Sequence, residues 1–476
     1  MFSVKEQKVL SSTFEKIHQY LSLENAPVVK FRDPVSLSKE IAFDIEAQGV
    51  SVQTFLTLMD QYLDFSVRTG DKQFLNQLYG GFNFPAFIGE VVTALTNTSM
   101  YTYEVAPVAT RIETTMIQLM NQYAGYTQGD GIFLSGGSNA NLVAMFSARN
   151  RLLPNARSGG LYGENKLTAF VNEKAHYSFE TAANILGIGA NQVIKVKSDE
   201  KGCLIPASLE AEIIASKNRG EIPFFVAATC ATTMQGAYDP IDAMAEICQR
   251  YKIWLHADGS FGGSLILSEQ HRHLMKGIEL TDSFAWNPHK LMNIPLICSA
   301  LLVKKKGTLQ QNITDINTDY IFHDIDEIED LGKKSIQCGR KVDAVKLWFA
   351  WKYYGIKGYQ ERMDHLMEVA AYAEAWVKKH PSLELMSPRQ SFAICFRFRP
   401  SFDTDLNAFN LSIRESLRKK GKSIVNFGHL NGDLVIRLIT ANGELSFEDM
   451  DTFFHQLIEE AQLLEQESLS SVELSN

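Results

Sequence analysis

The hydrophobic and polar positions of this chain change their spacing along its length. Up to about residue 70, apolar residues recur every three or four positions, which predicts helices. Between residues 71 and 345, short apolar runs alternate with helical segments, which predicts a largely parallel sheet with helices on both faces. The predicted strands are Gly131–Leu134, Leu167–Val171, Val193–Val196, Phe224–Thr229, Ile253–His256, Ser283–Trp286 and Ala300–Val303.

The pattern changes again after about residue 346. The long helical stretch Met363–Lys379 precedes two β-rich runs, Phe392–Phe398 and Leu434–Thr440, and a closing helix begins at Phe447. We therefore expect an N-terminal helical segment (1–70), a large α/β domain (71–345) and a small C-terminal α+β domain (346–476). The helices of the first part are too few to bury their own apolar faces, so they must pack on something else.

Two predicted strands end in residues that carry chemistry. One leads through His256 into Asp258 and a glycine-rich turn, and another leads through His289 into Lys290. Open α/β sheets collect catalytic groups at the ends of their strands. Pyridoxal phosphate needs a lysine for its aldehyde and a carboxylate for its ring nitrogen, so this pair indicates that cofactor. The alternatives are a surface lysine and a helix-capping aspartate, and the apolar surroundings disfavour both.

A glycine-rich turn, Ser135–Ser138, follows a predicted strand and opens a helix. Glycines let the backbone approach a ligand, and free amides at a helix start bind phosphate. We expect Gly137 and Ser138 to hold the cofactor phosphate, with His289 as a second side-chain donor. Taken alone, such a turn is more often an ordinary loop.

Composition excludes several classes of protein. The net charge of -9 is spread along the chain without a basic block, which argues against a nucleic-acid partner. The six cysteines lack metal-ligand spacing, so no metal site is expected. The N-terminus does not have the pattern of a signal peptide, and no apolar run is long enough to span a bilayer. We expect a cytoplasmic protein.

The sequence resembles the pyridoxal phosphate-dependent group II amino-acid decarboxylases. The motifs are SGGSNAN (Ser135–Asn141), AHYS (Ala175–Ser178), ATCATT (Ala228–Thr233), HADGSFGG (His256–Gly263) and WNPHK (Trp286–Lys290). The branch of cysteine sulfinate and glutamate decarboxylases is indicated by FLNQLYGG (Phe74–Gly81), NTSMYTYEVAPV (Asn97–Val108) and SIQCGRKVD (Ser335–Asp343). The resemblance implies a fold-type-I, aspartate aminotransferase-like homodimer with a mostly parallel seven-stranded sheet, whose N-terminal segment packs on the partner subunit.

The resemblance also implies roles for individual residues. Lys290 would form the Schiff base with pyridoxal 5'-phosphate, Asp258 would face the ring nitrogen, and His176 would stack on the ring. Thr233 and Ser260 would line the cofactor. Tyr320, in a polar stretch that resembles the family's mobile loop, matches the tyrosine that protonates Cα. The alternatives are a structural role for His176 and an ordinary loop-tethering aromatic for Tyr320.

Substrate-binding roles are implied for Gln77, Tyr79, Ser99, Tyr101 and Arg437. Arg437 matches the arginine that clamps a substrate carboxylate, although an arginine on a strand often points to solvent. Tyr79 replaces a small residue of glutamate decarboxylases and Ser99 replaces their asparagine, as in the members that act on cysteine sulfinate or aspartate. We therefore expect a decarboxylase of a small acidic L-amino acid that forms hypotaurine or β-alanine.

Other readings stay open at this point. They are glutamate decarboxylation to GABA, decarboxylation of diaminobutyrate or an aromatic amino acid, an aldehyde synthase, and an inactive paralogue that acts as a binding partner. The sequence also departs from the family pattern beside the cofactor. Gly259-Ser260-Phe261 replaces Ala-Ala-Trp, and Cys230-Ala231 replaces Ser-Gly. These departures put the tilt of the ring and the fit of the substrate in question.

Overall fold

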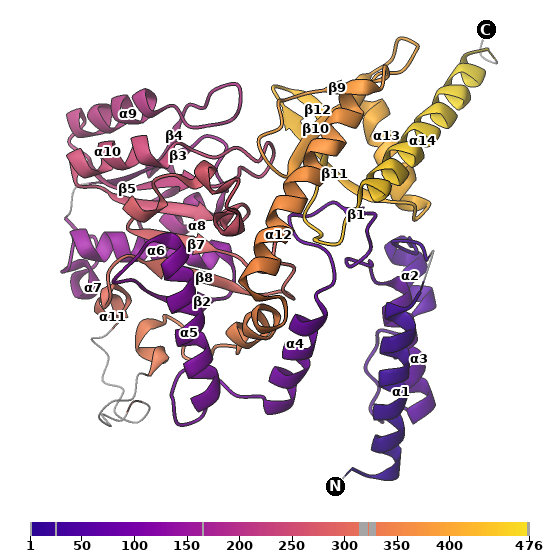
Figure 1. The fold of residues 1–476 in the computed structure, drawn as a ribbon, viewed down its shortest axis with the longest axis horizontal. Helices are drawn as coiled ribbons and strands as arrows, with labels where there is room; N and C mark the ends of the chain where they lie inside the picture. Colours follow the sequence, from indigo (N-terminus) through magenta and orange to yellow (C-terminus); the bar gives the residue numbers. More distant parts are fainter. Residues whose placement is uncertain (1, 24–25, 164–165, 314–321, 323–329, 474–476) are drawn as a thin grey trace.

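Two β-sheets organise the chain (Figure 1). The computed structural model describes residues 2–23, 26–163, 166–313, 322 and 330–473. The larger sheet has seven strands in the order β2-β8-β7-β6-β5-β3-β4. They are β2 (Asp130–Leu134), β3 (Leu167–Asn172), β4 (Val193–Val196), β5 (Ile222–Thr229), β6 (Trp254–Gly259), β7 (Ser283–Trp286) and β8 (Ser299–Val303).

The larger sheet is parallel from β4 through β7. Strand β8 runs antiparallel to both β7 and β2, because the connection 287–298 returns without a crossover helix. The expected mostly parallel seven-stranded sheet flanked by helices is therefore confirmed. All the predicted strands are present, with ends that differ by a few residues from those expected.

Helices cover both faces of this sheet. The helices of the chain are α1 (Val4–Leu21), α2 (Pro34–Glu40), α3 (Val52–Phe65), α4 (Phe84–Thr96), α5 (Pro107–Ala124), α6 (Gly137–Leu152), α7 (Ala156–Gly159), α8 (Ser178–Ile185), α9 (Pro206–Asn218), α10 (Ile241–Tyr251), α11 (Thr308–Ile313), α12 (Asp343–Lys379), α13 (Leu406–Lys419) and α14 (Phe447–Glu473). Side chains alternate between the faces of a strand. Val171 therefore packs with α6 and α8, whereas its neighbour Phe170 joins a core with α5, α9 and α10.

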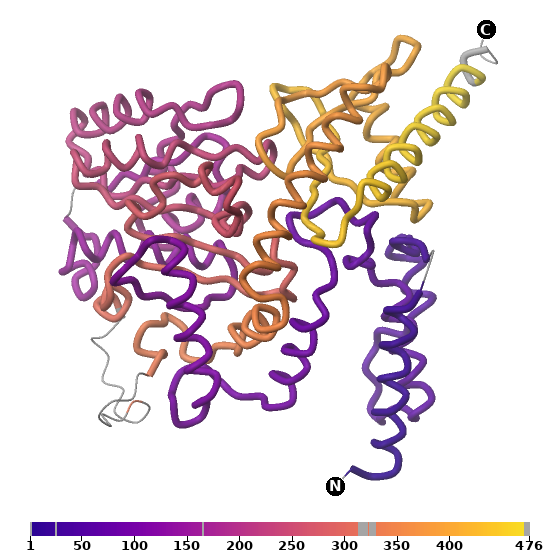
Figure 2. The backbone as a smooth tube through the Cα atoms, viewed as in Figure 1, coloured from indigo at the N-terminus to yellow at the C-terminus, as the bar shows by residue number. Residues whose placement is uncertain are grey.

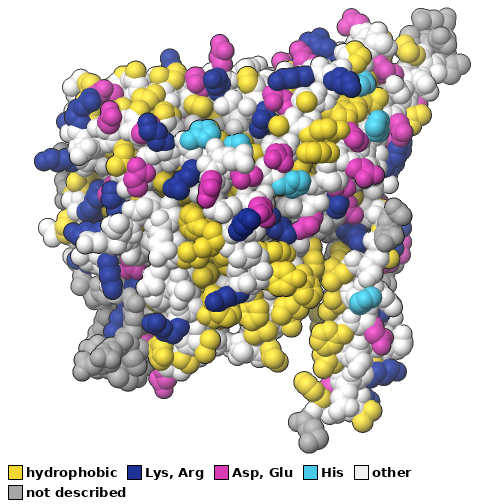
Figure 3. Space-filling view, viewed as in Figure 1, with side chains coloured by type: hydrophobic (Ala, Val, Ile, Leu, Met, Phe, Trp, Pro, Cys, Tyr) yellow, Lys and Arg dark blue, Asp and Glu magenta, His cyan; other side chains and the backbone are white. Residues whose placement is uncertain are grey.

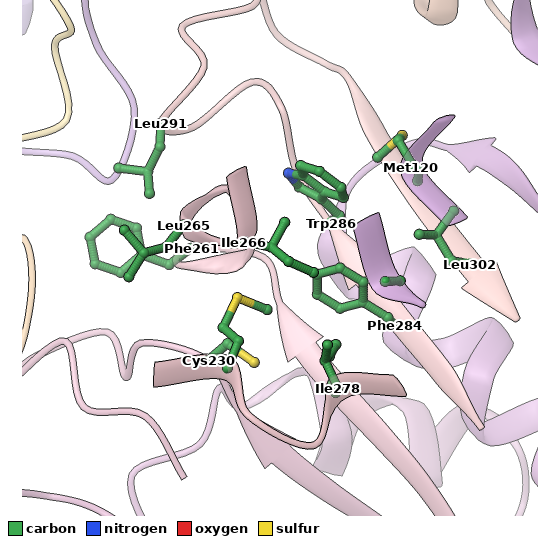
Figure 4. Close-up of a cluster of buried hydrophobic side chains, with 14 of the residues drawn as sticks. Met120, Cys230, Phe261, Leu265, Ile266, Ile278, Phe284, Trp286, Leu291 and Leu302 are labelled. Carbon is green, nitrogen blue, oxygen red and sulfur yellow. The ribbon is translucent and has the colours of Figure 1, made fainter. Parts of the chain in front are cut away.

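The core on the second face supports the turns that leave the strands. Phe284 and Trp286 of β7 lie beside Leu302 of β8 and Met120 of α5 (Figure 4). Leu291 belongs to the same cluster and is 1% exposed. Because Leu291 follows Lys290 directly, burial of its side chain anchors the lysine-bearing turn to the core.

The smaller sheet has five strands in the order β1-β11-β12-β10-β9. They are β1 (Phe74–Leu75), β9 (Leu383–Leu385), β10 (Ala393–Phe398), β11 (Ile424–Leu430) and β12 (Asp433–Ile439). Only β10 and β12 were predicted. Strand β1 lies within the range expected for the large domain, yet it pairs in parallel with β11. The long helix also begins at Asp343 rather than at Met363, with a non-helical residue at Gly355.

The N-terminal helices stand beside the rest of the chain (Figure 2). Helix α1 contacts α3 but contains no buried residue. The segment between α1 and α2 is attached to the smaller sheet, since Val28 is buried and its N–H donates to the Gly421 carbonyl at 3.0 Å. Within the described residues, no helix combines the length and the apolar character needed to cross a membrane.

A buried lysine holds the connection between β7 and β8. The Lys346 side chain is 0% exposed, and its Nζ forms ion pairs with Asp343 at 2.9 Å and Glu90 at 3.0 Å. The same ammonium donates to the carbonyls of Pro295 at 3.1 Å and Ile297 at 2.7 Å. Because these carbonyls lie in the connection that carries Lys290, the ammonium fixes the shape of that connection.

We expect Lys346→Met to lower the free energy of unfolding by about 3 kcal/mol or more, because it leaves the largely buried Asp343 carboxylate without its cation and removes one of the two cations that pair with Glu90. The matched control is Lys341→Met, since Lys341 also pairs with Glu90 but its side chain is 56% exposed. That change should cost less than about 1 kcal/mol. Chemical denaturation measures both, and equal losses would contradict the assignment.

Candidate active site

A cavity of about 200 Å³ lies where strands of the larger sheet end. It is lined by Leu78, Gly137, Ser138, Asn141, His176, Thr229, Ala231, Thr233, Asp258, Ser260, Phe261, Asn287, His289 and Lys290. These residues follow or end β2, β3, β5, β6 and β7, apart from Leu78. Neighbouring parallel strands present their carboxyl ends at the same edge of a sheet, which explains how side chains so distant in sequence meet.

Lys290 is held in a tight turn after β7. Its N–H donates to the Asn287 carbonyl, and its own carbonyl accepts from the Asn293 N–H, each at 3.0 Å. Burial lowers the pKa of Lys290 to about 8, Asp258 opposes that shift, and Arg437 adds to it. A substantial fraction of this amine is therefore neutral near physiological pH, as a nucleophilic lysine requires.

Asp258 is a buried carboxylate with both oxygens occupied. Its Oδ1 accepts from the Ser260 N–H at 3.0 Å and its Oδ2 accepts from Asn141 Nδ2 at 2.9 Å. Burial would raise the pKa of Asp258, but the hydrogen bonds from Ser260 and Asn141, together with the electrostatic interaction with His256, outweigh burial and hold it below its ordinary value. The carboxylate is therefore ionised and can face a protonated ring nitrogen.

The start of α6 forms a cradle with the glycine-rich turn. Gly136 has φ +119°, and no side chain caps the helix, so its first amides are free for a ligand. A Cβ on Gly137 would lie 2.3 Å from Ser260 Oγ, so only glycine leaves this space open. Ser260 Oγ is buried without a hydrogen-bond partner in the described residues. Free amides and an unsatisfied hydroxyl fit the phosphate of the expected cofactor.

Two histidines complete the cavity wall. The backbone N–H of Ser178 donates to His176 Nδ1 at 3.2 Å. Burial lowers the pKa of His176, which favours a neutral ring. His289 Nδ1 lies 2.6 Å from the Cys298 carbonyl oxygen, so this backbone contact orients the His289 ring. Burial lowers the pKa of His289 to about 4.

The sequence-predicted residues divide into two groups. Those in the cavity wall are Gly137, Ser138, His176, Thr233, Asp258, Ser260, His289 and Lys290. Gln77 is exposed, and Tyr79 packs against Phe74 with ring centroids 6.1 Å apart. The stretch from Ser99 to Tyr101 bonds instead to the segment 332–340. Tyr320 lies outside the described residues.

Arg437 comes from the smaller sheet and lies beside the cavity rather than in its wall. Its side chain is buried, and its two terminal nitrogens donate to the carbonyls of Thr233 at 2.8 Å and Asn76 at 3.1 Å. Within the described residues, its Nε has no hydrogen-bond partner and no carboxylate lies within ion-pair distance. In that part of the chain, Arg437 is thus a buried cation without a paired anion.

Sequence reasoning missed Asn141 and Asn287 as residues of the cavity wall. Asn141 lies one helical turn after Gly137, so both residues face the same side of α6. That spacing could have indicated its position. Asn287 Oδ1 accepts from Ser299 Oγ of β8 at 2.6 Å, a contact that depends on the antiparallel return of β8. No local pattern predicts such a contact.

The Cys230-Ala231 departure has a visible structural consequence. Ala231 has φ +70°, the left-handed region that favours glycine. The glycine usual at this position in the resembling family is therefore explained by the backbone. Ala231 still lines the cavity, and its methyl group stands where the family has only hydrogen. Cys230 next to it is buried and has a free thiol.

Comparisons with known proteins agree with this geometry. A family model described as the pyridoxal-dependent decarboxylase conserved domain matches residues 34–399. Cysteine sulfinic acid decarboxylase of Mus musculus is 36% identical over 444 residues, which is 90% of each chain. Acidic amino acid decarboxylase GADL1 of Mus musculus is 36% identical over 447 residues, covering 91% of this chain and 81% of that protein.

Solved structures agree as well. The crystal structure of mouse CSAD has a TM-score of 0.92 at 34% identity and covers 96% of this chain and 98% of that one. The structure of Oryza sativa TDC with PLP and tryptamine has a TM-score of 0.89 at 24% identity, covering 98% and 100%. The second likeness bears on the fold alone.

Covalent capture of added pyridoxal phosphate by the cofactor-free protein should increase with pH, with a midpoint near 8. Only the neutral amine attacks, so capture is lost below the pKa of Lys290. Stopped-flow absorbance across the neutral and alkaline range measures the midpoint. Arg437→Met should move it upward, because that arginine contributes to the lowering. A midpoint at the ordinary lysine value of about 10.4 would contradict the burial of Lys290.

Proposed function

Because the chain belongs to the pyridoxal-dependent decarboxylase family, and is therefore a pyridoxal phosphate-dependent carboxy-lyase, we propose that its substrate is a small acidic L-amino acid. Cysteine sulfinate or aspartate is the first choice, with hypotaurine or β-alanine as product. The observation that carries this proposal is the buried guanidinium of Arg437 beside the cavity, which pairs with no carboxylate of the described residues. The names of the similar proteins, which act on cysteine sulfinic acid or acidic amino acids, point the same way.

The surroundings of Arg437 explain why an anion is needed there. Burying a charge without a partner is costly, and two backbone carbonyls offset only part of that cost. A carboxylate or sulfinate on the substrate side chain would supply the missing charge. The free Nε and the planar guanidinium suit a carboxylate held by two hydrogen bonds. An aromatic substrate would leave the cation unpaired.

The cofactor half of the proposed site follows from the cavity wall. Lys290 would hold the cofactor covalently, Asp258 would keep its ring nitrogen protonated, and His176 would lie against the ring. The free amides at the start of α6, with Ser138 and His289, would bind the phosphate. When bound, pyridoxal phosphate supplies the electron sink that accepts the bonding pair left behind by carbon dioxide.

A proton donor is also needed after carbon dioxide leaves. We assign this step to Tyr320, on its resemblance to the family's tyrosine.

The residues around Arg437 determine which length of acidic substrate the site favours. Tyr79 and Ser99 differ from the residues of glutamate decarboxylases in a way that favours a shorter acid. Tyr79 packs against Phe74 of β1. Asn76 directly follows β1, and its carbonyl accepts a hydrogen bond from Arg437. Glutamate, giving GABA, is the alternative substrate, since one methylene is worth only about 1–3 kcal/mol of discrimination.

We also propose that two chains pair as a homodimer. Helix α1 buries none of its residues within one chain, and Phe14 of α1 and Tyr62 of α3 are 57% and 72% exposed. Hydrophobic side chains gather on the face over α4 and α12 (Figure 3). On these two helices, Leu95 of α4 is 82% exposed and Tyr353 of α12 is 69% exposed. Apolar surface of this extent is typical of a protein interface.

The substrate is tested by a carbon dioxide release screen. The substrates are aspartate, cysteine sulfinate, cysteic acid, glutamate, diaminobutyrate and aromatic amino acids. We expect cysteine sulfinate or aspartate to have the highest kcat/KM. Lys290→Ala should abolish both turnover and the absorbance band of the bound cofactor. Equal or better turnover of aromatic amino acids would overturn the proposal.

Arg437→Met should lower kcat/KM for acidic substrates by roughly 10- to 100-fold, the range for one lost hydrogen-bonded charge. The matched control is Arg397→Met, since Arg397 is also a buried strand arginine but pairs with Glu384 at 2.6 Å. That control should reduce stability without changing the ratio of kcat/KM between aspartate and an uncharged amino acid. A retained ratio in Arg437→Met would contradict the assignment.

A further inference from the structure

A line of buried hydrogen bonds runs from β6 to the Asp258 carboxylate. Trp254 Nε1 lies 2.8 Å from Ser283 Oγ, which lies 2.8 Å from His256 Nδ1. His256 Nε2 lies 3.0 Å from Asn141 Oδ1, and Asn141 Nδ2 lies 2.9 Å from Asp258 Oδ2. All five side chains are buried. We call this set the Asp258 relay.

The direction of every bond in the Asp258 relay follows from its two ends. Asp258 accepts only, so the Asn141 amide must point its NH2 group at the carboxylate, and Ser178 Oγ accepts the second hydrogen at 3.0 Å. Asn141 Oδ1 therefore faces His256, and His256 Nε2 must carry a hydrogen. At the other end, the Trp254 indole can only donate to Ser283.

His256 is neutral in this arrangement. Its ring is fully buried against Phe179 and Phe225, with centroids 6.3 Å and 5.8 Å away. Burial lowers the pKa of His256 to about 4 although Asp258 opposes the shift. With the hydrogen on Nε2, Nδ1 has a lone pair and accepts from the Ser283 hydroxyl. One tautomer of His256 and one orientation of Asn141 satisfy all these groups.

We propose that Ser283, His256 and Asn141 are positioning residues that hold Asp258 ionised and oriented for the ring nitrogen of the cofactor. This inference rests on the role of Asp258 in the proposed function. A neutral histidine leaves the full charge of Asp258 available to the ring, whereas an imidazolium would compete for it. Ser283 does not contact Asp258, but it fixes the tautomer of His256. Loss of its hydroxyl removes the only donor that the described residues place on His256 Nδ1.

Without that donor, the His256 ring can adopt the other tautomer. Its Nε2 lone pair would then face Asn141 Oδ1, and the repulsion would be relieved by rotation of the Asn141 amide. Rotation places the amide oxygen against Asp258 Oδ2 and removes a hydrogen bond that keeps this carboxylate ionised. The effect reaches only a ligand that has a nitrogen facing Asp258.

A cofactor analogue isolates this effect. In 1-deazapyridoxal phosphate a C–H group replaces the ring nitrogen, and the phosphate and aldehyde are unchanged. We expect the unaltered protein to bind pyridoxal phosphate more tightly than this analogue, as measured by dissociation constants from fluorescence titration of the cofactor-free protein. Ser283→Ala should reduce the preference by roughly tenfold, the lower end of the effect usual for a residue that orients a ligand-binding group.

The chain offers a matched control. Ser264 Oγ also accepts a hydrogen bond from a buried indole, Trp286 Nε1, at 2.8 Å, but Ser264 has no hydrogen bond to the Asp258 relay. Ser264→Ala should therefore keep the full preference for the nitrogen-containing cofactor. Asn141→Ala cuts the relay at its other end, so it should reduce the preference, and the double variant Ser283→Ala/Asn141→Ala should lose little more than either single variant.

The outcomes separate this inference from the proposed function. If the unaltered protein binds both cofactors equally, the role assigned to Asp258 fails. If it prefers the nitrogen-containing cofactor and Ser283→Ala keeps that preference, the Asp258 relay is overturned. It is also overturned if Ser264→Ala loses as much preference as Ser283→Ala, or if the losses in the double variant are additive.

Discussion

The site depends on keeping one carboxylate ionised where water is excluded. Asp258 lies one residue before the end of β6 and is only 5% exposed, so its charge must be stabilised by the protein. The Ser260 amide and the Asn141 side chain provide that stabilisation, one on each oxygen. The glycine-rich turn after β6 and the helix after β2 therefore have to be in place before the carboxylate can serve a cofactor. The charge of the site therefore depends on the same turn and helix that complete the fold around the larger sheet.

The connection between β7 and β8 meets a second requirement of the site. It must bring Lys290 toward Asp258 while the amine stays neutral enough to react. Leu291 fixes one side of the connection in the core, and the Lys346 ammonium binds its far side through two carbonyls. One lysine is thus paired and structural, whereas the other has no ion pair with the described residues and has a lowered pKa. Lys346 and Lys290 have the same side chain, so their different surroundings account for their different roles.

Much of the larger domain was predictable because its strands are continuous apolar runs and its site residues lie directly after them. Asp258, Lys290 and Gly137 could be found in this way. The remainder depends on contacts between distant segments. The two residues of β1 carry no strand signal and are ordered by pairing with β11. The direction of β8 and the position of Asn287 likewise follow from how the strands of the larger sheet pair, which no local pattern records.

The two sheets supply different parts of the proposed site. The residues that we propose for the cofactor lie at the ends of strands of the larger sheet, whereas Arg437 comes from β12 and is tied to the larger domain through the Thr233 carbonyl. Arg340 ties the 99–101 stretch to the end of β2 by donating to Met100 and Phe133 and pairing with Glu113. The proposed contact to the substrate side chain and the proposed contacts to the cofactor are therefore carried by different sheets, which the hydrogen bond from Arg437 to Thr233 joins.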